Sequence, residues 1–265
     1  MEDRIKVLFL ASDPFRDRTP LRLDEEVRAI EQALRKGRTR SRVRLVSCFA
    51  TRTRDLQTAL MEHDPRIVHF AGHGGDGVIF LGDAQGRPGV VGKESLTKLF
   101  GILNEWIRVV ILNGCNTLST IEALSDVVDY TIGMSQPLTD ASAIDFAEAF
   151  YTAIGMGKTV RAAFDLAVNQ LQLDNNDEAS IPVLRVRAGV DPAVPLLAER
   201  PAASRGAAEP PRPADGQVVS IGKFEVDDAV WENGAGSDTD GPQQIKIDEA
   251  RGRGYTFRNG VTPRP

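Results

Sequence analysis

Two segments, HFAGHGG (residues 69–75) and VVILNGCNT (residues 109–117), decide the fold that this sequence predicts. Each reads as a hydrophobic strand followed by a glycine-containing turn, and each turn carries a chemically active side chain. These side chains are the imidazole of His73 and the thiol of Cys115. Because parallel strands end at one edge of their sheet, both side chains are expected to face a common crevice as nucleophile and proton acceptor. The leading hypothesis is therefore a cysteine peptidase.

Outside these segments, hydrophobic runs alternate with stretches of helical periodicity over residues 5–187. The pattern predicts strands at residues 5–11, 43–49, 67–71, 78–81, 107–112, 129–134 and 181–187. It predicts helices at residues 23–36, 54–63, 94–105, 121–127, 141–154 and 159–173. Strands that alternate with helices indicate an α/β fold with a mainly parallel sheet and helices on both faces.

The composition is that of an ordinary globular protein with no general attraction to nucleic acid or membranes. Of 265 residues, 42% are hydrophobic and 26% are charged, and the net charge is −5. Two cysteines, Cys48 and Cys115, are too few for a secreted disulfide scaffold. The sequence shows no signal-peptide pattern and no apolar run near the roughly 20 residues of a membrane span. We therefore expect a cytoplasmic protein with reduced thiols, and no metal or cofactor is predicted.

The sequence predicts three regions. Residues 1–190 form the α/β domain, and residues 191–216 form a linker rich in Pro, Ala, Arg and Gly. Residues 217–265 form a small tail with strand-like pieces at 218–226, 244–248 and 255–257. The tail is too small and polar to bury a convincing core alone, so it is expected to be disordered or to dock on a partner protein.

Several residues have simpler interpretations than catalysis. A cysteine at the end of a strand is often a small buried hydrophobic residue, and Cys48 is interpreted only in this way. His69 lies within its strand and is expected to be packed or hydrogen-bonded. The glycine-rich residues 72–77 are also compatible with phosphate binding, but they lack the Lys-Ser/Thr of a P-loop and the spacing of a dinucleotide-binding motif.

The two opening segments, together with LFLASDP (8–14), LRLDEEVRAIEQAL (21–34), DLQTALMEHDPRIVHFAGHG (55–74) and GMSQPLTDASAIDFAEAFYTAIGMGKTVRAAFDLA (133–167), resemble the CHAT peptidases. These form a caspase-like branch of the caspase–gingipain–separase clan, and the resemblance covers about residues 5–187. It implies a three-layer sandwich with a six-stranded, mainly parallel sheet. It also implies His73 as the catalytic histidine, Cys115 as the nucleophile, and the N–H groups of Gly74 and Cys115 as oxyanion donors. The clan usually works as a dyad, so no third catalytic residue is predicted, although Asp76 is nearby in sequence.

The resemblance also bears on substrate choice. Members of the clan other than true caspases commonly cut after arginine or lysine, and residues 136–140 resemble the region where separases place an acidic pocket residue. Asp140 is therefore the predicted substrate-binding residue, since a carboxylate pairs well with an arginine side chain. The alternative role for Asp140 is the N-cap of the helix at 141–154. The sequence does not reveal the arginine-lined pocket that cleavage after aspartate would require.

CHAT domains often belong to bacterial defence or programmed-death systems, in which a sensor activates them. The resemblance therefore implies a latent peptidase that acts on proteins or peptides and is activated by a protein that contacts the tail. The enzyme is also a candidate to cut its own linker at Arg200, Arg205 or Arg212. Two other functions stay open: a caspase-like scaffold whose dyad is unused, and a flavodoxin-like nucleotide or cofactor binder.

Overall fold

The computed structural model describes residues 4–174 and 176–197, together with four short strands nearer the C-terminus. The chain divides into two compact units, residues 1–198 and residues 199–265. In the second unit, β10 (Phe224–Val226) pairs antiparallel with β11 (Ala229–Trp231), and β12 (Ala250–Gly252) pairs antiparallel with β13 (Tyr255–Phe257). The strands predicted at 218–226 and 255–257 overlap β10 and β13, whereas the strand predicted at 244–248 lies outside the described residues.

The first unit is built on a six-stranded sheet in the order β2-β1-β3-β7-β8-β9. Its strands are β1 (Ile5–Ser12), β2 (Val43–Cys48), β3 (Ile67–Gly72), β7 (Val109–Asn113), β8 (Tyr130–Met134) and β9 (Pro182–Val186). Every neighbouring pair is parallel except β8 and β9, which are antiparallel. The prediction of a six-stranded, mainly parallel sheet is confirmed.

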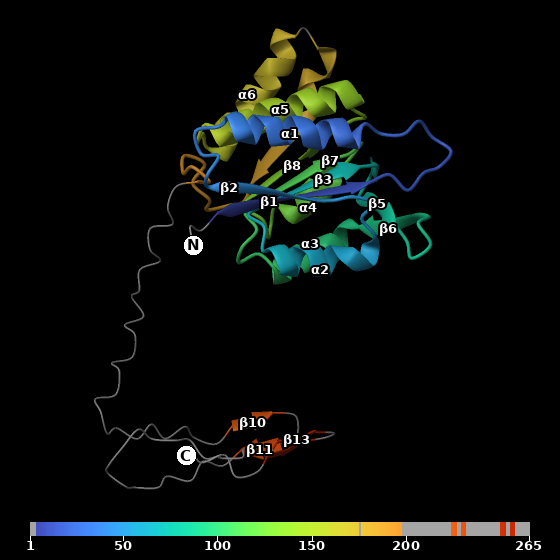
Figure 1. Ribbon diagram of the computed structural model, residues 1–265, viewed down its shortest axis with the longest axis vertical. Helices are drawn as coiled ribbons and strands as arrows, with labels where there is room; N and C mark the ends of the chain where they lie inside the picture. Colours follow the sequence, from blue (N-terminus) through green and yellow to red (C-terminus); the bar gives the residue numbers. More distant parts are fainter. Residues whose placement is uncertain are drawn as a thin grey trace, which may run out of the picture. The chain divides into compact units, whose positions relative to one another are not determined.

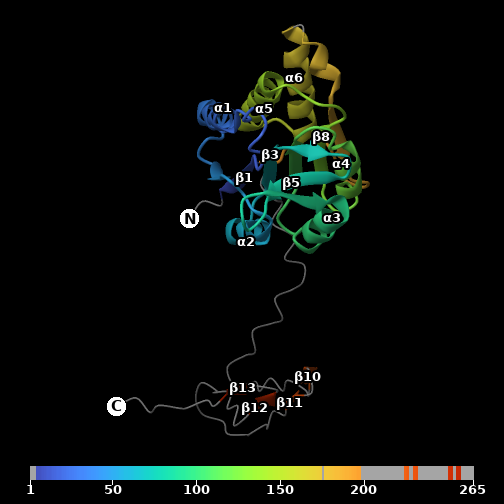
Figure 2. The same cartoon turned by 90° about the vertical axis from the view of Figure 1, so that its right-hand side faces the viewer.

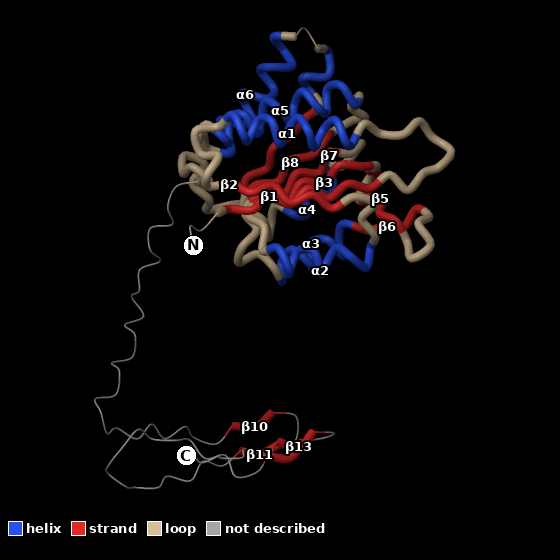
Figure 3. Tube along the Cα trace, viewed as in Figure 1, coloured by secondary structure: helices blue, strands red, loops and turns tan. Residues whose placement is uncertain are grey.

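Helices cover both faces of this sheet and complete the three-layer sandwich that the sequence predicts (Figures 1 and 2). One face carries α1 (Leu23–Lys36), α5 (Asp140–Gly155) and α6 (Val160–Leu173). The other face carries α2 (Thr53–His63), α3 (Lys93–Ile102) and α4 (Leu118–Leu124). Figure 3 shows the strands as a layer between the two groups of helices.

The two-residue period of the strands divides the core between these faces. In β1, Val7 and Phe9 pack with the α1–α5–α6 layer, while Leu8 and Leu10 pack with the α2–α3–α4 layer. All four side chains are buried, as expected for a strand that is covered on both sides. The same period turns His69 of β3 toward the layer that contains α1 and α5, because His69 alternates with Val68 and Phe70.

Helices α1 and α5 approach each other closely at one end. A Cβ atom on Gly37, the residue after α1, would lie 2.5 Å from the carbonyl oxygen of Gly155. Thr39 then donates its hydroxyl hydrogen to that oxygen over 2.9 Å. Gly37 therefore sets how near the two helices lie, and this pair forms one wall of the pocket described below.

A second, three-stranded antiparallel sheet was only partly predictable. It consists of β4 (Gly74–Gly75), β5 (Val78–Gly82) and β6 (Pro88–Gly92), and only the β5 region was expected to be extended. The other two strands are short and rich in glycine, so neither has the hydrophobic alternation that indicates a strand. This small sheet begins directly after His73 and holds the turn that carries it.

The packed domain extends beyond the boundary expected at residue 190. Leu196 and Leu197 belong to the buried core, and Pro195 forms an isolated bridge with Thr159. The first residues of the predicted linker are therefore part of the domain, because these leucines complete its hydrophobic core. Among the residues that the structure describes, no helix has the length and apolar character needed to cross a membrane.

Candidate active site

The candidate site lies where the strand order reverses. The chain runs from β1 to β2 on one side and to β3 on the other, and such a switch point leaves a crevice at the carboxyl ends of the strands. Asp13 follows β1, His73 follows β3, and Cys115 follows β7 by two residues. Since β1, β3 and β7 are adjacent and parallel, three chemically active side chains leave the sheet at the same edge.

The turns that carry His73 and Cys115 are in direct backbone contact. A Cβ atom on Gly74 would lie 2.5 Å from the carbonyl oxygen of Cys115, and a Cβ atom on Gly114 would lie 2.7 Å from the carbonyl oxygen of Gly72. Any side chain at these positions would push the turns apart. The glycines that suggested tight turns in the sequence therefore have a more specific role, which is to let the two turns meet.

His73 is oriented by a carboxylate that the sequence did not reveal. Its Nε2 lies 3.1 Å from Oδ1 of Asp13, and both side chains are mostly buried, with 14% and 17% exposed. Because a carboxylate only accepts, Nε2 carries the hydrogen, which leaves Nδ1 as the basic nitrogen of the neutral ring. The ring of Phe15 packs edge-on against the imidazole at a centroid distance of 4.9 Å. Asp13 is itself fixed by the Leu21 N–H, which donates to Oδ2 over 3.0 Å.

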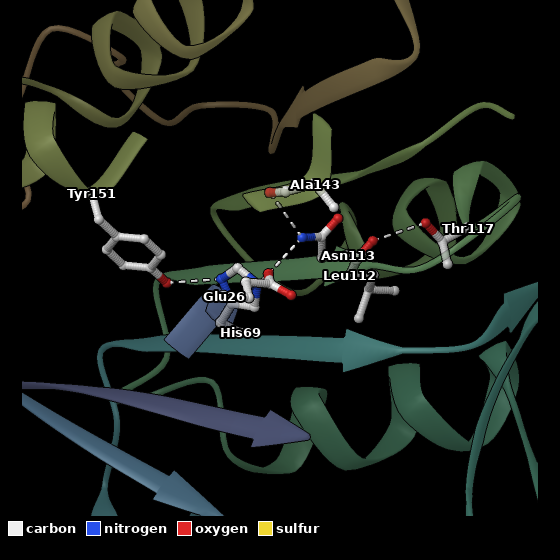
Figure 4. A network of polar contacts seen from close by, with 7 residues as sticks. All are labelled: Glu26, His69, Leu112, Asn113, Thr117, Ala143 and Tyr151. Atoms are coloured by element: carbon white, nitrogen blue, oxygen red, sulfur yellow. Dashed lines mark hydrogen bonds and ion pairs between the residues drawn. The ribbon is translucent and has the colours of Figure 1, made fainter. Parts of the chain in front are cut away.

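The hydroxyl of Thr117, a fully buried residue, fixes the backbone of the turn around Cys115. The Thr117 hydroxyl lies 3.1 Å from the carbonyl oxygen of Leu112 (Figure 4). It also lies 3.1 Å from the carbonyl oxygen of Gly114, and it accepts a hydrogen bond from the N–H of Met134 over 2.9 Å. Asn116 has a left-handed backbone with φ of 53°, which asparagine tolerates better than most residues. The thiol is therefore carried on a turn with a fixed backbone.

A small pocket of about 50 Å³, open to solvent, contains both His73 and Cys115 in its lining. Its other lining residues come from α1, α5 and the turns that precede them: Leu21, Arg22, Leu23, Glu26, Leu138, Asp140, Ala143 and Ile144. Gly72, Asn113 and Gly114 complete it at the strand ends. The structure therefore brings together all four residues that the sequence predicted for the site, since Gly74 contacts Cys115 and the other three line the pocket.

Asp140 is not the N-cap of its helix. Helix α5 begins at Asp140, and Thr139 is the capping residue, with its side-chain oxygen accepting from the N–H of Ser142. The alternative assignment of Asp140 as the N-cap is therefore wrong by one residue. Its Oδ2 accepts a hydrogen bond from the backbone N–H of Arg22 over 3.2 Å, so its carboxylate sits at the pocket where α1 and α5 begin.

A buried polar network lies behind the pocket (Figure 4). Oε1 of Glu26 lies 2.8 Å from Nε2 of His69 and 2.6 Å from Nδ2 of Asn113. Nδ1 of His69 lies 3.1 Å from the hydroxyl of Tyr151, and the Asn113 amide also donates to the carbonyl of Ala143 over 3.4 Å. The expectation that His69 is packed and hydrogen-bonded is confirmed, because it is fully buried in this network.

Cys48 and Asp76 do not belong to the candidate site. Cys48 packs against the core on the α2–α3–α4 face, and burial together with Glu62 and Asp55 raises the pKa of its thiol. Asp76 accepts a hydrogen bond from the Ser119 hydroxyl over 2.6 Å rather than from His73. Within the described part of the chain, no group of three or more His, Cys, Asp or Glu side chains is arranged to hold a metal ion.

Sequence reasoning missed Asp13, Glu26 and Asn113. Asp13 and Asn113 each stand at the carboxyl end of a predicted strand, so their positions were available as a signal. Glu26 stands among other acidic residues in the first turns of α1, where charge complementarity to the helix dipole explains them equally well. Only the three-dimensional arrangement separates the buried Glu26 from its exposed neighbour Glu25.

The CHAT domain model matches residues 11–183. Among solved structures, the chain is similar to a secreted C11 cysteine protease from Bacteroides thetaiotaomicron, "iotapain", with a TM-score of 0.47 and 12% sequence identity. The similarity covers 69% of this chain and 66% of that protease, and no curated protein sequence matches. With a family model that spans well over half of its length, this chain belongs to the CHAT domain family.

Proposed function

We propose that this protein is a cysteine endopeptidase in which His73 and Cys115 form the catalytic dyad. The observation that carries the proposal is the backbone contact between the two turns, which places both side chains in the lining of one pocket. A thiol and an imidazole in such an arrangement are the parts of nucleophilic acyl transfer, because the imidazole accepts the thiol proton and the thiolate attacks. Membership of the CHAT domain family supports the same activity.

We propose a separate role for each ring nitrogen of His73. Nε2 is engaged by Asp13, so Nδ1 takes the proton of the Cys115 thiol. The thiolate then attacks the carbonyl carbon of the scissile peptide bond, and negative charge develops on the carbonyl oxygen. We assign the N–H groups of Gly74 and Cys115 as donors to that oxygen. The protonated imidazole returns its proton to the leaving amine, and water hydrolyses the resulting thioester.

The proposed substrates are proteins or peptides that are cut after a basic residue. Asp140 supports this preference, since its carboxylate lines the pocket that also contains Cys115. Arg22 lines the same pocket, but its guanidinium is paired with Glu25, with Nε of Arg22 2.9 Å from Oε1 of Glu25. An arginine side chain of the substrate would therefore meet carboxylate oxygens in this pocket rather than an unpaired cation.

The direct test is hydrolysis of a denatured protein mixture by the full-length chain, followed by mass spectrometry of the new N-termini. We expect new termini that follow arginine or lysine with the wild-type protein and none with Cys115→Ala or His73→Ala. Cys48→Ser is the matched control and should cut as wild type does, because Cys48 packs against the core away from the site. Identical peptide lists from wild type and Cys115→Ala would contradict the proposal and favour the scaffold.

Activation is a second part of the proposal. As in bacterial defence systems that use CHAT domains, we propose that the enzyme stays latent in the cytoplasm until a partner protein binds the tail at residues 217–265. The chain without its partner then has a low basal activity, which the hydrolysis test measures. The linker arginines lie outside the described residues, and cleavage there by the enzyme itself is tested by the intact mass of purified protein. Identical masses for wild type and Cys115→Ala, with the partner absent and present, would end the self-cleavage hypothesis.

A further inference from the structure

We propose that Glu26 is the charged floor of the substrate pocket and the main residue that selects a lysine or arginine side chain before the cut. This inference rests on the proposed peptidase function, and it moves the main selectivity from Asp140 to a residue on α1. Glu26 lines the pocket that contains His73 and Cys115 and is only 4% exposed. A carboxylate this deeply buried beside a candidate nucleophile requires a physical explanation, because an uncompensated buried charge is costly.

The described contacts of Glu26 leave one carboxylate oxygen for a ligand. Both hydrogen bonds that reach its side chain, from His69 and from Asn113, end on Oε1. Among the described residues, none donates a hydrogen bond to Oε2, and this oxygen is not sealed off from solvent. Together with the position of Glu26 in the pocket lining, this is the arrangement expected if Oε2 faces the pocket and Oε1 anchors the group behind it.

The charge of Glu26 is not neutralised by His69. Burial raises the pKa of Tyr151 well above its usual value, and the Glu26 carboxylate raises it further, so the phenol keeps its hydrogen. Tyr151 is fully buried, and a hydroxyl hydrogen without an acceptor would be costly there, so it donates to Nδ1 of His69. The other ring nitrogen then carries the hydrogen of a neutral imidazole and donates it to Glu26.

Neither Asn113 nor Arg22 supplies the missing positive charge. The Asn113 amide is neutral, and it divides its donors between Glu26 and the carbonyl of Ala143. Arg22 lines the pocket, but its guanidinium is committed to Glu25 on the solvent side, where the two side chains are 50% and 42% exposed. Of the described residues, two carboxylates, Glu26 and Asp140, therefore line a pocket whose guanidinium is already paired.

Electrostatics in this confined pocket favour a cation. A cationic substrate side chain would compensate Glu26 in surroundings of low polarity, where a charge pair counts for more than in water. A neutral side chain of similar length would leave the carboxylate uncompensated, and an acidic one would add repulsion. Asp140, on the first turn of α5, then acts on the cation of the same side chain from the other wall.

The first experiment measures kcat/KM on fluorogenic peptides that carry Arg, Lys, Leu, Gln or Asp before the cut, for the full-length chain. Glu26→Gln keeps the shape and the acceptor for His69 and Asn113 but removes the charge. We expect about a 100-fold or greater loss on the Arg and Lys peptides and less than about a threefold change on the Leu and Gln peptides. Glu31→Gln, an exposed glutamate on the same helix that pairs with Arg35, is the control and should leave all values unchanged.

The second experiment measures binding without catalysis. N-acetyl-argininamide and N-acetyl-norleucinamide are titrated into Cys115→Ala and into the double variant Cys115→Ala, Glu26→Gln by calorimetry. We expect binding of the arginine compound alone, with its loss in the double variant. If the wild-type chain cuts no peptide but Cys115→Ala binds the arginine compound only when Glu26 is present, the peptidase is contradicted and the pocket is supported. Cleavage without Glu26-dependent binding would support the peptidase but overturn the pocket.

Two further results decide the inference. Equal losses on all five peptides in Glu26→Gln would make Glu26 a structural residue, and a wild-type preference for the Leu or Asp peptide would overturn its role. If Glu26→Gln fails to fold, thermal stabilisation of Cys115→Ala by each compound replaces the calorimetry. Stabilisation by the arginine compound alone supports a pocket that selects basic side chains, and equal stabilisation by both compounds overturns it.

Discussion

The Cα of Gly74 faces the carbonyl oxygen of Cys115 so closely that a Cβ atom would lie 2.5 Å from it. The same Cβ atom would lie 2.7 Å from Cγ2 of Thr117, which is fully buried and cannot move aside. An atom at 2.5 Å from backbone oxygen must displace one of the two turns. The contact between these turns is therefore the feature that sets the relative position of His73 and Cys115.

We predict that Gly74→Ala lowers kcat/KM by at least about tenfold, because a displacement of the reacting groups by even 1 Å is strongly felt in the rate. The matched control is Gly101→Ala in α3, where a Cβ atom would find only Val127 at 3.6 Å. That change should leave activity intact and raise the free energy of unfolding by about 0.5–1 kcal/mol, since alanine is the better helix former. Urea unfolding and peptide hydrolysis together measure both effects. Full activity in Gly74→Ala would show that the turns tolerate separation.

Asp13→Asn tests the carboxylate that contacts His73. The amide can donate as well as accept, so it no longer enforces the hydrogen on Nε2, and the basic Nδ1 is lost in part of the molecules. We expect kcat to fall by at least about tenfold while KM changes little, as for a residue that positions a general base. Asp17→Asn, an exposed residue of the same loop, is the control. A change confined to KM would assign Asp13 to substrate binding instead.

Asp140→Ala tests the second carboxylate of the pocket. We expect cleavage of Arg and Lys peptides to fall by about five- to tenfold, less than in Glu26→Gln, because Asp140 starts a helix at the pocket edge and is better solvated. Its loss also removes a negative charge from the N-terminus of α5, which costs about 0.3–1 kcal/mol of stability. A panel of peptides that differ in the residue before the cut separates the loss of selectivity for Arg and Lys from the loss of stability. Equal slowing on every peptide would indicate a folding role alone.

Tyr151→Phe tests the buried network. The substitution removes the hydroxyl that lies 3.1 Å from Nδ1 of His69 and leaves that nitrogen without its donor. We expect the free energy of unfolding to fall by about 1–3 kcal/mol, the usual cost of an unsatisfied buried polar group. Chemical denaturation monitored by circular dichroism measures it. Tyr130→Phe is the control, because its hydroxyl bonds to the backbone carbonyl of Asp191 away from the pocket. Unchanged stability in Tyr151→Phe would show that water or another group replaces the donor.

The central strands and the two reactive turns were predictable because their signal is local. Segments such as β3 and β7 are continuous hydrophobic runs followed by glycine, and a strand buried on both faces produces this pattern. Strands β4 and β6 have no comparable run, because they belong to a small sheet at the edge of the domain. The boundary at residue 190 was placed too early. Leu196 and Leu197 pack in the core, but two adjacent leucines form no periodic pattern that would indicate a helix or a strand.

The supporting residues of the site were not predictable, because their partners are distant in sequence. Asp13 and His73 are 60 positions apart, and Glu26 and His69 are 43 positions apart. Their contacts depend on β1 lying next to β3 and on α1 packing on the sheet face to which His69 points, which a single sequence does not specify. The one-residue error in the cap of α5 has a different cause, since Thr139 and Asp140 are both good capping residues and only the backbone decides between them.

Cys48 is an internal reference for the reactivity of the Cys115 thiol. Burial, with Glu62 and Asp55, raises the pKa of the Cys48 thiol, so the thiolate fraction of Cys48 is small near neutral pH and grows only as the pH rises. We expect iodoacetamide at pH 7 to label Cys115 well before Cys48, and labelling of Cys48 to increase in alkaline buffer. Preferential labelling of Cys48 at pH 7 would contradict the assignment of Cys115 as the nucleophile.

The measurement that tests the central claim most directly is the rate of Cys115 alkylation at pH 7 in wild type and His73→Ala, followed by intact mass with Cys48→Ser as background. The experiment is run with and without peptide substrate. If His73 takes the proton of Cys115, the rate falls at least about tenfold in His73→Ala, and substrate protects the wild-type thiol. Equal rates in the two proteins would show that the imidazole and the thiol do not act together.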